Sequence, residues 1–223
     1  MGEAAELRLR MVNNQLRTFD VTDYRVQDAM LLVPRERYVP ADMRGIAYSD
    51  DAIAIAHDAH GRPQRTMTTP AVLGRLLQLA QIQEDDVVLL VGAGLGYTAA
   101  VIGELASSVI ALESDADLAT LAQNNLEAGG VDNAVVVTGP LPEGYAKEAP
   151  YDQIFVDGAV LTDPAALEAQ LKPGGRMVYV HGEGLAGRAR LVTRGEHGFA
   201  SRDAFNAAAG TLPGFVPEPT FTF

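Results

Sequence analysis

The sequence predicts an α/β protein with a doubly wound, mostly parallel sheet and an N-terminal helical elaboration. An unbroken apolar run over residues 87–91 is typical of a strand buried on both faces of such a sheet. Three alternating glycines follow it, and then a segment of helical composition over residues 97–106. A second apolar run over residues 109–112 repeats the strand. Strands that alternate with helices in this way predict parallel pairing.

Helices are expected before the first of these strands. Apolar residues at helical spacing predict one over about 4–17, and Asp23 is a candidate cap for another over about 24–32. Residues 41–65 are expected to be irregular. Pro70, with a threonine before it as the cap, is expected to begin a third helix.

The segments after the second apolar run continue the alternation of strands and helices. Glycine and proline clusters separate them. The expected elements are a helix over about 114–127, strands over 134–138 and 151–157, a short helix over about 163–170, a strand over 177–180, antiparallel strands near 190–193 and 199–205, and a proline-rich tail.

Length and composition indicate one compact unit. At 223 residues, 48% of them hydrophobic, the chain is long enough to bury a full core. We expect an N-terminal elaboration over residues 1–70 and the core of the fold over residues 71–223. The sequence has no cysteine, which excludes disulfides and thiol nucleophiles.

Net charge and hydropathy indicate which classes of partner the protein can bind. The formal net charge of −12 opposes nucleic-acid binding, because a phosphate backbone demands a basic surface. No apolar segment approaches membrane-spanning length, and residues 1–6 lack the charged-then-apolar order of a signal peptide. We therefore expect a cytoplasmic protein with neither nucleic acid nor membrane as a partner.

The glycine-rich turn indicates a nucleotide-type cofactor site. Gly92, Gly94 and Gly96 let the backbone turn sharply and approach a ligand closely. Glu113 ends the next strand, where its carboxylate can accept hydrogen bonds from a ribose diol. The dinucleotide fingerprint would place its third glycine where Tyr97 stands, which disfavours a nicotinamide cofactor. The alternative is a glycine-rich turn with no ligand.

Polar residues near expected element ends are further candidates. Three threonines crowd the segment before Pro70, and because capping needs only one of them, Thr66 or Thr68 is left available for a substrate. Composition alone favours capping and turn roles for all three. Asp157 lies at the carboxyl end of an expected strand, where ligands bind in open α/β sheets, although a turn-capping role is equally consistent.

A metal site is not expected. His57 and His60 flank Asp58 in a polar stretch. Two histidines without a third ligand at metal spacing are typical of a solvated loop.

Taken together, these segments resemble the protein-L-isoaspartate O-methyltransferase family. That family uses S-adenosylmethionine to methylate isoaspartyl carboxylates in damaged proteins. The resemblance runs from about residue 11 to about residue 180, and the Val-Pro-Arg-Glu block distinguishes this family from other methyltransferases. The matching segments are Met11–Arg17, Val33–Pro40, Ala47–Asp50, Val88–Tyr97 and Leu171–Arg176.

The resemblance implies a Rossmann-like methyltransferase fold and a set of site residues. Thr68 falls on the serine that holds the acceptor carboxylate, with Thr66 and Arg65 as second candidates, and Arg65 could pair with that carboxylate. Isoaspartyl proteins or peptides would be the partners, and S-adenosylhomocysteine the product of the cofactor. The implied cofactor-binding residues are Gly92, Ala93, Gly94, Gly96, Tyr97, Glu113, Ser114, Pro140, Leu141 and Asp157.

Three departures from the family pattern keep other functions open. Gln64–Arg65 replaces a Gly-Gln pair in the substrate loop, Pro140 replaces the aspartate that binds the adenine amino group, and Phe205–Ala208 blurs a Phe-Val-Pro-Leu motif. The alternatives are a methyltransferase of the same fold with another acceptor and a non-catalytic binding protein. The intact glycines and Glu113 argue against complete loss of the cofactor site.

Overall fold

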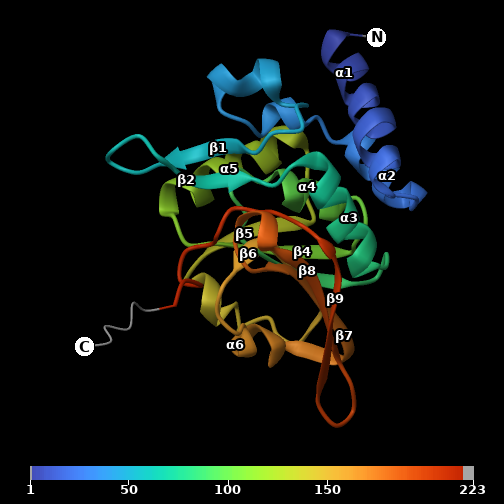
Figure 1. Ribbon diagram of the computed structural model, residues 1–223, viewed down its shortest axis with the longest axis vertical. Helices are drawn as coiled ribbons and strands as arrows, with labels where there is room; N and C mark the ends of the chain where they lie inside the picture. Colours follow the sequence, from blue (N-terminus) through green and yellow to red (C-terminus); the bar gives the residue numbers. More distant parts are fainter. Residues whose placement is uncertain (1, 218–223) are drawn as a thin grey trace.

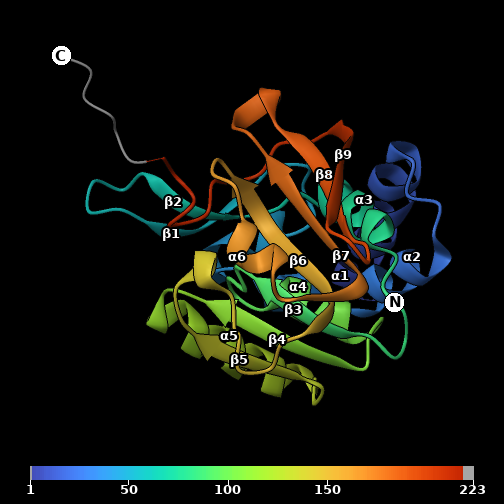
Figure 2. The ribbon, with the colours of Figure 1, turned by 90° about the horizontal axis from the view of Figure 1, so that it is seen from below.

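The computed structural model describes residues 2–217, and within them it has a seven-stranded sheet and a separate two-stranded one (Figure 1). The large sheet runs in the order β5-β4-β3-β6-β7-β8-β9, which Figure 2 shows from one edge to the other. β5 through β7 pair in parallel, whereas β8 and β9 are antiparallel, so the predicted fold class is confirmed. The strands are β3 (Val87–Val91), β4 (Ser108–Glu113), β5 (Ala134–Thr138), β6 (Tyr151–Val160), β7 (Leu171–His181), β8 (Arg188–Arg194) and β9 (Phe199–Asn206).

Both faces of the sheet are buried, as the apolar runs predict. Along β3, Val88 and Leu90 face one core, whereas Leu89 and Val91 face another, because successive side chains of a strand point to opposite sides. Residues of the helices α3 (Pro70–Ala80), α4 (Tyr97–Gly103) and α5 (Ala116–Gly129) contribute to the first core. The short helix α6 (Ala165–Glu168) contributes to the second core, together with part of the C-terminal segment.

The helices that precede β3 form where they are expected, with two differences in detail. α1 (Glu3–Met11) continues as a π-helical turn and then a 3₁₀ turn, so the stretch predicted as one helix changes its winding. The Asp23 side chain accepts a hydrogen bond from the Arg25 N–H at 2.8 Å and caps α2 (Tyr24–Leu32). Thr69 stands at the start of α3, but its side chain makes no capping hydrogen bond.

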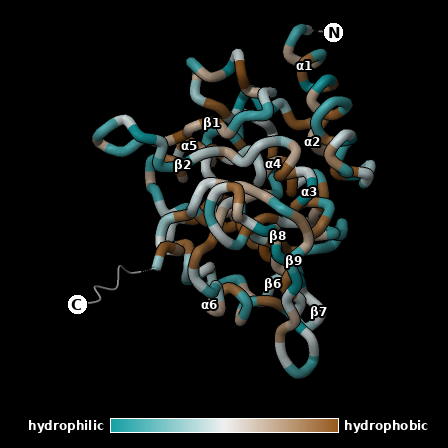
Figure 3. The backbone as a smooth tube through the Cα atoms, in the orientation of Figure 1, coloured by the Kyte–Doolittle hydropathy of each residue, from teal (hydrophilic) through white to brown (hydrophobic). Residues whose placement is uncertain are grey.

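The region expected to be irregular contains a hairpin. After a 3₁₀ segment over Ala41–Ile46, β1 (Ile53–His57) pairs with β2 (Pro63–Met67) in an antiparallel ribbon. Asp58 accepts hydrogen bonds from the N–H groups of His60 and Arg62 and shapes the turn. Figure 3 shows hydrophilic residues at the tip of this hairpin. Among residues 2–217, no helix is long and apolar enough to cross a membrane.

The segment after β9 returns to the middle of the large sheet. The Ala159 N–H donates to the Gly210 carbonyl at 2.8 Å, and the Leu212 N–H donates to the Ala159 carbonyl at 3.0 Å. Leu212 thereby lies over Gly158 of β6 and over Gly92. The segment thus closes one side of the carboxyl end of β3, while residues 218–223 of the expected tail lie outside the described residues.

Substitution of Gly158 by alanine is expected to destabilise the fold by about 1–3 kcal/mol, because the added methyl overpacks a filled space. Its Cβ would lie 2.5 Å from Leu212 Cγ and 3.0 Å from the Gly210 carbonyl oxygen. Urea unfolding measures the loss. Gly45→Ala is the matched control, since nothing lies within 4 Å of its added Cβ. Equal stability of Gly158→Ala and the wild type would contradict the close packing of the C-terminal segment.

Candidate active site

The site lies where the strand order reverses. β4 and β5 lie on one side of β3, whereas β6, the next strand along the chain, lies on the other. In open α/β sheets, ligands bind in the crevice at the carboxyl ends of the strands at this position. The turn Gly92–Gly96 follows β3, and Asp157 belongs to the neighbouring strand β6. The predicted turn and the predicted acid therefore come together at this edge.

The glycine turn has a conformation that other residues rarely adopt. Gly92, Gly94 and Gly96 have φ angles of +90°, +56° and +94°. A Cβ on Gly94 would lie 2.9 Å from the Ile55 side chain of β1, so the backbone of the turn directly faces the hairpin. A Cβ on Gly96 would lie 3.2 Å from the Ala122 carbonyl oxygen, so this glycine lets α4 pack closely on α5.

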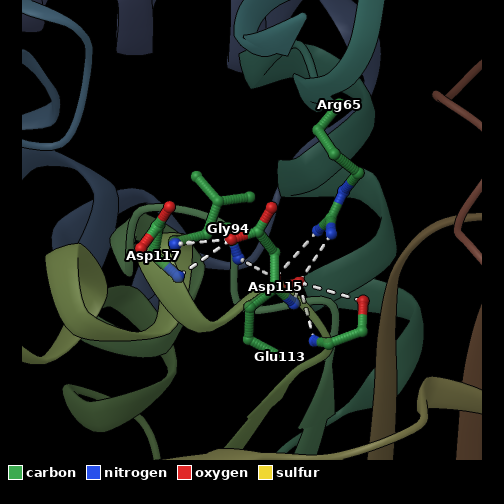
Figure 4. Close-up of polar contacts among 7 residues, drawn as sticks. Arg65, Gly94, Glu113, Asp115 and Asp117 are labelled. Atoms are coloured by element: carbon green, nitrogen blue, oxygen red, sulfur yellow. Dashed lines mark hydrogen bonds and ion pairs between the residues drawn. The ribbon is translucent and has the colours of Figure 1, made fainter. Parts of the chain in front are cut away.

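Glu113 ends β4 as a fully buried carboxylate. The N–H groups of Gly94 and Ser114 donate to its two oxygens, each at 2.8 Å. Arg65 of β2 adds a two-pronged ion pair, with Nη1 2.6 Å from Oε1 and Nη2 2.9 Å from Oε2 (Figure 4). A buried charge is costly without such partners, so the pair holds the hairpin against the end of β4.

Asp157 binds two threonine hydroxyls. Thr68 donates to Oδ1 at 2.6 Å and Thr98 donates to Oδ2 at 2.5 Å. Because a threonine hydroxyl can donate only one hydrogen bond, Thr68 directs that bond to Asp157 in this arrangement. Asp157 therefore connects the segment before α3 to the first turn of α4.

A fully buried arginine supports the same segment from behind. Arg35 donates to the carbonyl oxygens of Ala47 and Thr68, both at 2.9 Å, and its guanidinium lies 4.7 Å from the centre of the Tyr97 ring. Burial lowers the pKa of Arg35, while the nearby Tyr97 and Asp157 act in the opposite direction. Arg35 belongs to the Val-Pro-Arg-Glu block, so a residue of that block holds the Thr68 backbone at the cavity.

Most of the predicted site residues line one small cavity. Its volume is about 20 Å³, enough for about one water molecule. Gly96, Glu113 and Ser114 do not line it: Gly96 packs against α5, Glu113 is fully buried and paired with Arg65, and Ser114 is exposed. Pro140 is exposed and Leu141 is buried in the second core, so the structure does not bring these two to the cavity. The predicted residues that line it are Arg65, Thr66, Thr68, Gly92, Ala93, Gly94, Tyr97 and Asp157.

Sequence reasoning did not single out five residues that line the cavity, Arg35, Ile55, Met67, Leu95 and Thr98. Arg35 and Thr98 fix the segments that surround it, and Ile55 covers Gly94. Arg35 did carry a signal, because it is a charged residue in a segment that begins with Val33–Pro34 and ends with Val39–Pro40. Thr98 and Ile55 carry no such signal, because threonine in a first helical turn and isoleucine in a strand are ordinary.

The sheet order, the glycine turn after β3 and the acid that closes β4 define a Rossmann-like methyltransferase fold. The family model for protein-L-isoaspartate(D-aspartate) O-methyltransferase matches residues 8–205. The chain belongs to this family.

Relatives named protein-L-isoaspartate O-methyltransferase are similar along most of the chain. The one from Koribacter versatilis is 43% identical over 171 residues, which cover 77% of this chain and 74% of the relative. The one from Methylorubrum extorquens is 38% identical over 202 residues, which cover 90% of this chain and 86% of the relative.

Solved structures support the fold. A protein-L-isoaspartate O-methyltransferase superposes with a TM-score of 0.79 at 24% identity, covering 93% of this chain and 66% of the other. A Plasmodium falciparum protein in complex with S-adenosyl-L-homocysteine superposes with a TM-score of 0.77 at 19% identity, covering 95% and 99% of the two chains.

Substitution of Glu113 by glutamine is expected to cost about 3–5 kcal/mol of stability, because it leaves Arg65 buried without a counter-charge. Urea unfolding measures the loss, and the double variant Glu113→Gln/Arg65→Gln should lose less than the sum of the single ones. Glu127→Gln on the exposed face of α5 is the matched control, with a change within about 0.5 kcal/mol. Additive losses in the double variant would show that the two side chains do not interact.

Proposed function

We propose that this protein transfers the methyl group of S-adenosylmethionine to the carboxylate of isoaspartyl residues in damaged proteins, in the cytoplasm. The observation that carries the proposal is the position of Glu113 at the end of β4, where it accepts a hydrogen bond from the Gly94 turn and pairs with Arg65, the residue before Thr66 in the substrate segment. In the proposal, Glu113 binds the cofactor and the segment that contains Thr66 and Thr68 binds the acceptor, at the same edge of the sheet.

The residues present fit the cofactor. Glu113 would hold the ribose hydroxyls, and Gly92 and Gly94 would admit the methionine portion, since their missing side chains bring the backbone of the turn close to a ligand. The backbone around Pro140 and Leu141 would lie along the edge of the adenine ring. When bound, the cofactor supplies an electrophilic methyl group on a sulfonium.

Pro140 weakens this fit without abolishing it. Proline has neither a carboxylate nor a backbone N–H to offer the adenine. Losing one hydrogen bond to a charged group costs about 1.5–3 kcal/mol, or roughly one to two decades of affinity. The remaining contacts of Gly94 and Glu113 are unaffected by the substitution.

Methyl transfer to a carboxylate requires side chains that position the reactants rather than side chains that transfer protons. An isoaspartyl carboxylate is already ionised at neutral pH and is an adequate nucleophile, so no strong general base is needed. Holding the carboxylate in line with the methyl group and excluding water then provide most of the rate enhancement. Thr68 would orient the acceptor carboxylate, with Thr66 and Arg65 as further contacts, and Asp157 sets the hydroxyl of Thr68.

Titration calorimetry of S-adenosylhomocysteine tests the cofactor part of the proposal. We expect micromolar binding by the wild type and its loss in Glu113→Ala, because the ribose would lose its acceptor. Glu127→Ala, an exposed acid on α5, should bind like the wild type. Failure of the wild type to bind at millimolar ligand would overturn the methyltransferase assignment for this chain.

Replacing Thr68 with valine tests the acceptor part. Valine keeps the shape but removes the hydroxyl, so kcat/KM for methylation of an isoaspartyl peptide should fall by about tenfold or more. Thr68→Ser should retain most of the activity, and both variants should bind S-adenosylhomocysteine like the wild type. Equal activity of Thr68→Val and the wild type would show that Thr68 does not act on the acceptor. A peptide with an ordinary aspartyl residue in place of the isoaspartyl residue controls for specificity.

A second candidate function is methyl transfer to a different acceptor. Gln64–Arg65 in place of the family's Gly-Gln pair favours it, since the change falls on the hairpin strand beside the cavity. Tight binding of S-adenosylhomocysteine together with no methylation of isoaspartyl peptides would select this candidate.

A further inference from the structure

We propose that Arg65 exchanges partners during binding. It pairs with Glu113 until the cofactor's ribose hydroxyls take that carboxylate, and it then pairs with the carboxylate of the acceptor. The inference rests on the proposed function and adds a device for ordering the two ligands. Its basis is the set of donors that already occupy the hydrogen-bond acceptor positions of the Glu113 carboxylate.

The carboxylate of Glu113 has no free capacity while Arg65 is bound. Its two oxygens offer about four acceptor positions. Oε1 accepts from Arg65 and from the Ser114 N–H, and Oε2 accepts from Arg65 and from the Gly94 N–H. The Asp115 N–H is also within 3.2 Å of Oε1. A ribose diol would bring two more donors, so at least one present partner must leave.

Arg65 is the partner that can leave. The N–H groups of Gly94 and Ser114 are fixed by the glycine turn after β3 and by the chain that enters α5. Arg65 is a long side chain on a two-stranded ribbon outside the large sheet. Arg65 lines the adjacent cavity of about 20 Å³ whereas the fully buried Glu113 does not, so the carboxylate is not open to this cavity while it is paired with the guanidinium.

The released guanidinium has an acceptor carboxylate as its natural partner. Arg65 lies on the same strand as Thr66 and close to Thr68, and all three line the cavity. In this structure the Thr68 hydroxyl donates its one hydrogen bond to Asp157, so it can donate to the acceptor only after turning away from Asp157. Arg35 also lines the cavity, but the carbonyls of Ala47 and Thr68 hold it in place. A planar guanidinium matches a carboxylate with two parallel hydrogen bonds.

This exchange couples the two ligands. Binding of the cofactor makes Arg65 available and so raises the affinity for the acceptor, and by linkage the acceptor raises the affinity for the cofactor by the same factor. The pairing with Glu113 in turn lowers the apparent cofactor affinity, because only molecules with a displaced Arg65 can bind.

Calorimetry on four proteins tests the exchange: the wild type, Arg65→Gln, Arg65→Lys and Arg62→Gln. Removing the competitor should tighten S-adenosylhomocysteine binding by about tenfold in Arg65→Gln, and less in Arg65→Lys, which keeps the charge but loses the two-pronged geometry. Arg62→Gln, an exposed arginine of the same hairpin, should match the wild type. Urea unfolding shows that each variant is folded under the conditions used.

A second titration measures the coupling. An isoaspartyl peptide should bind the wild type more tightly with saturating S-adenosylhomocysteine than without it, and this difference should disappear in Arg65→Gln. Unchanged or weaker S-adenosylhomocysteine binding by Arg65→Gln overturns the exchange and leaves the proposed function intact. Absence of binding by every protein, the wild type included, overturns the proposed function and the exchange together.

Discussion

The arrangement of the site depends on one buried carboxylate. Glu113 is fully buried at the end of β4, and an ionised group in that position must be given donors. They come from three separate segments: the glycine turn through Gly94, the start of the next helix through Ser114, and the hairpin through Arg65. The need to satisfy one side chain therefore fixes the relative positions of the parts of the chain that would surround a cofactor.

The sequence predicts the sheet well because its strands carry strong local signals. β3 and β4 are apolar on both faces and are joined by the glycine turn and α4, so periodicity and turn chemistry agree. The hairpin is different. β1 and β2 have five residues each, and β2 mixes proline, polar and charged residues, so no single period dominates. Its pairing depends instead on tertiary contacts such as Arg65 with Glu113, which are 48 positions apart.

The sequence predicts individual site residues but not the contacts between them. Residue type and position at the end of an expected strand were enough to select Glu113 and Asp157, whereas Thr68 was selected by the resemblance to the family. The bond between Thr68 and Asp157 joins residues 89 positions apart, and no local pattern encodes it. Thr98, the second partner of Asp157, lies in a helix of otherwise small and apolar residues. Local sequence therefore supplies the participants, whereas the topology of the sheet decides which of them meet.

Charge balance within the site then bears on its function. Two acids, the fully buried Glu113 and the partly buried Asp157, lie near two buried arginines, Arg65 and Arg35, in a chain whose formal net charge is −12. An acceptor carboxylate that enters this region adds a third negative charge, which is unfavourable unless a guanidinium becomes free to meet it. Neutral ribose hydroxyls can replace Arg65 at Glu113 without adding charge.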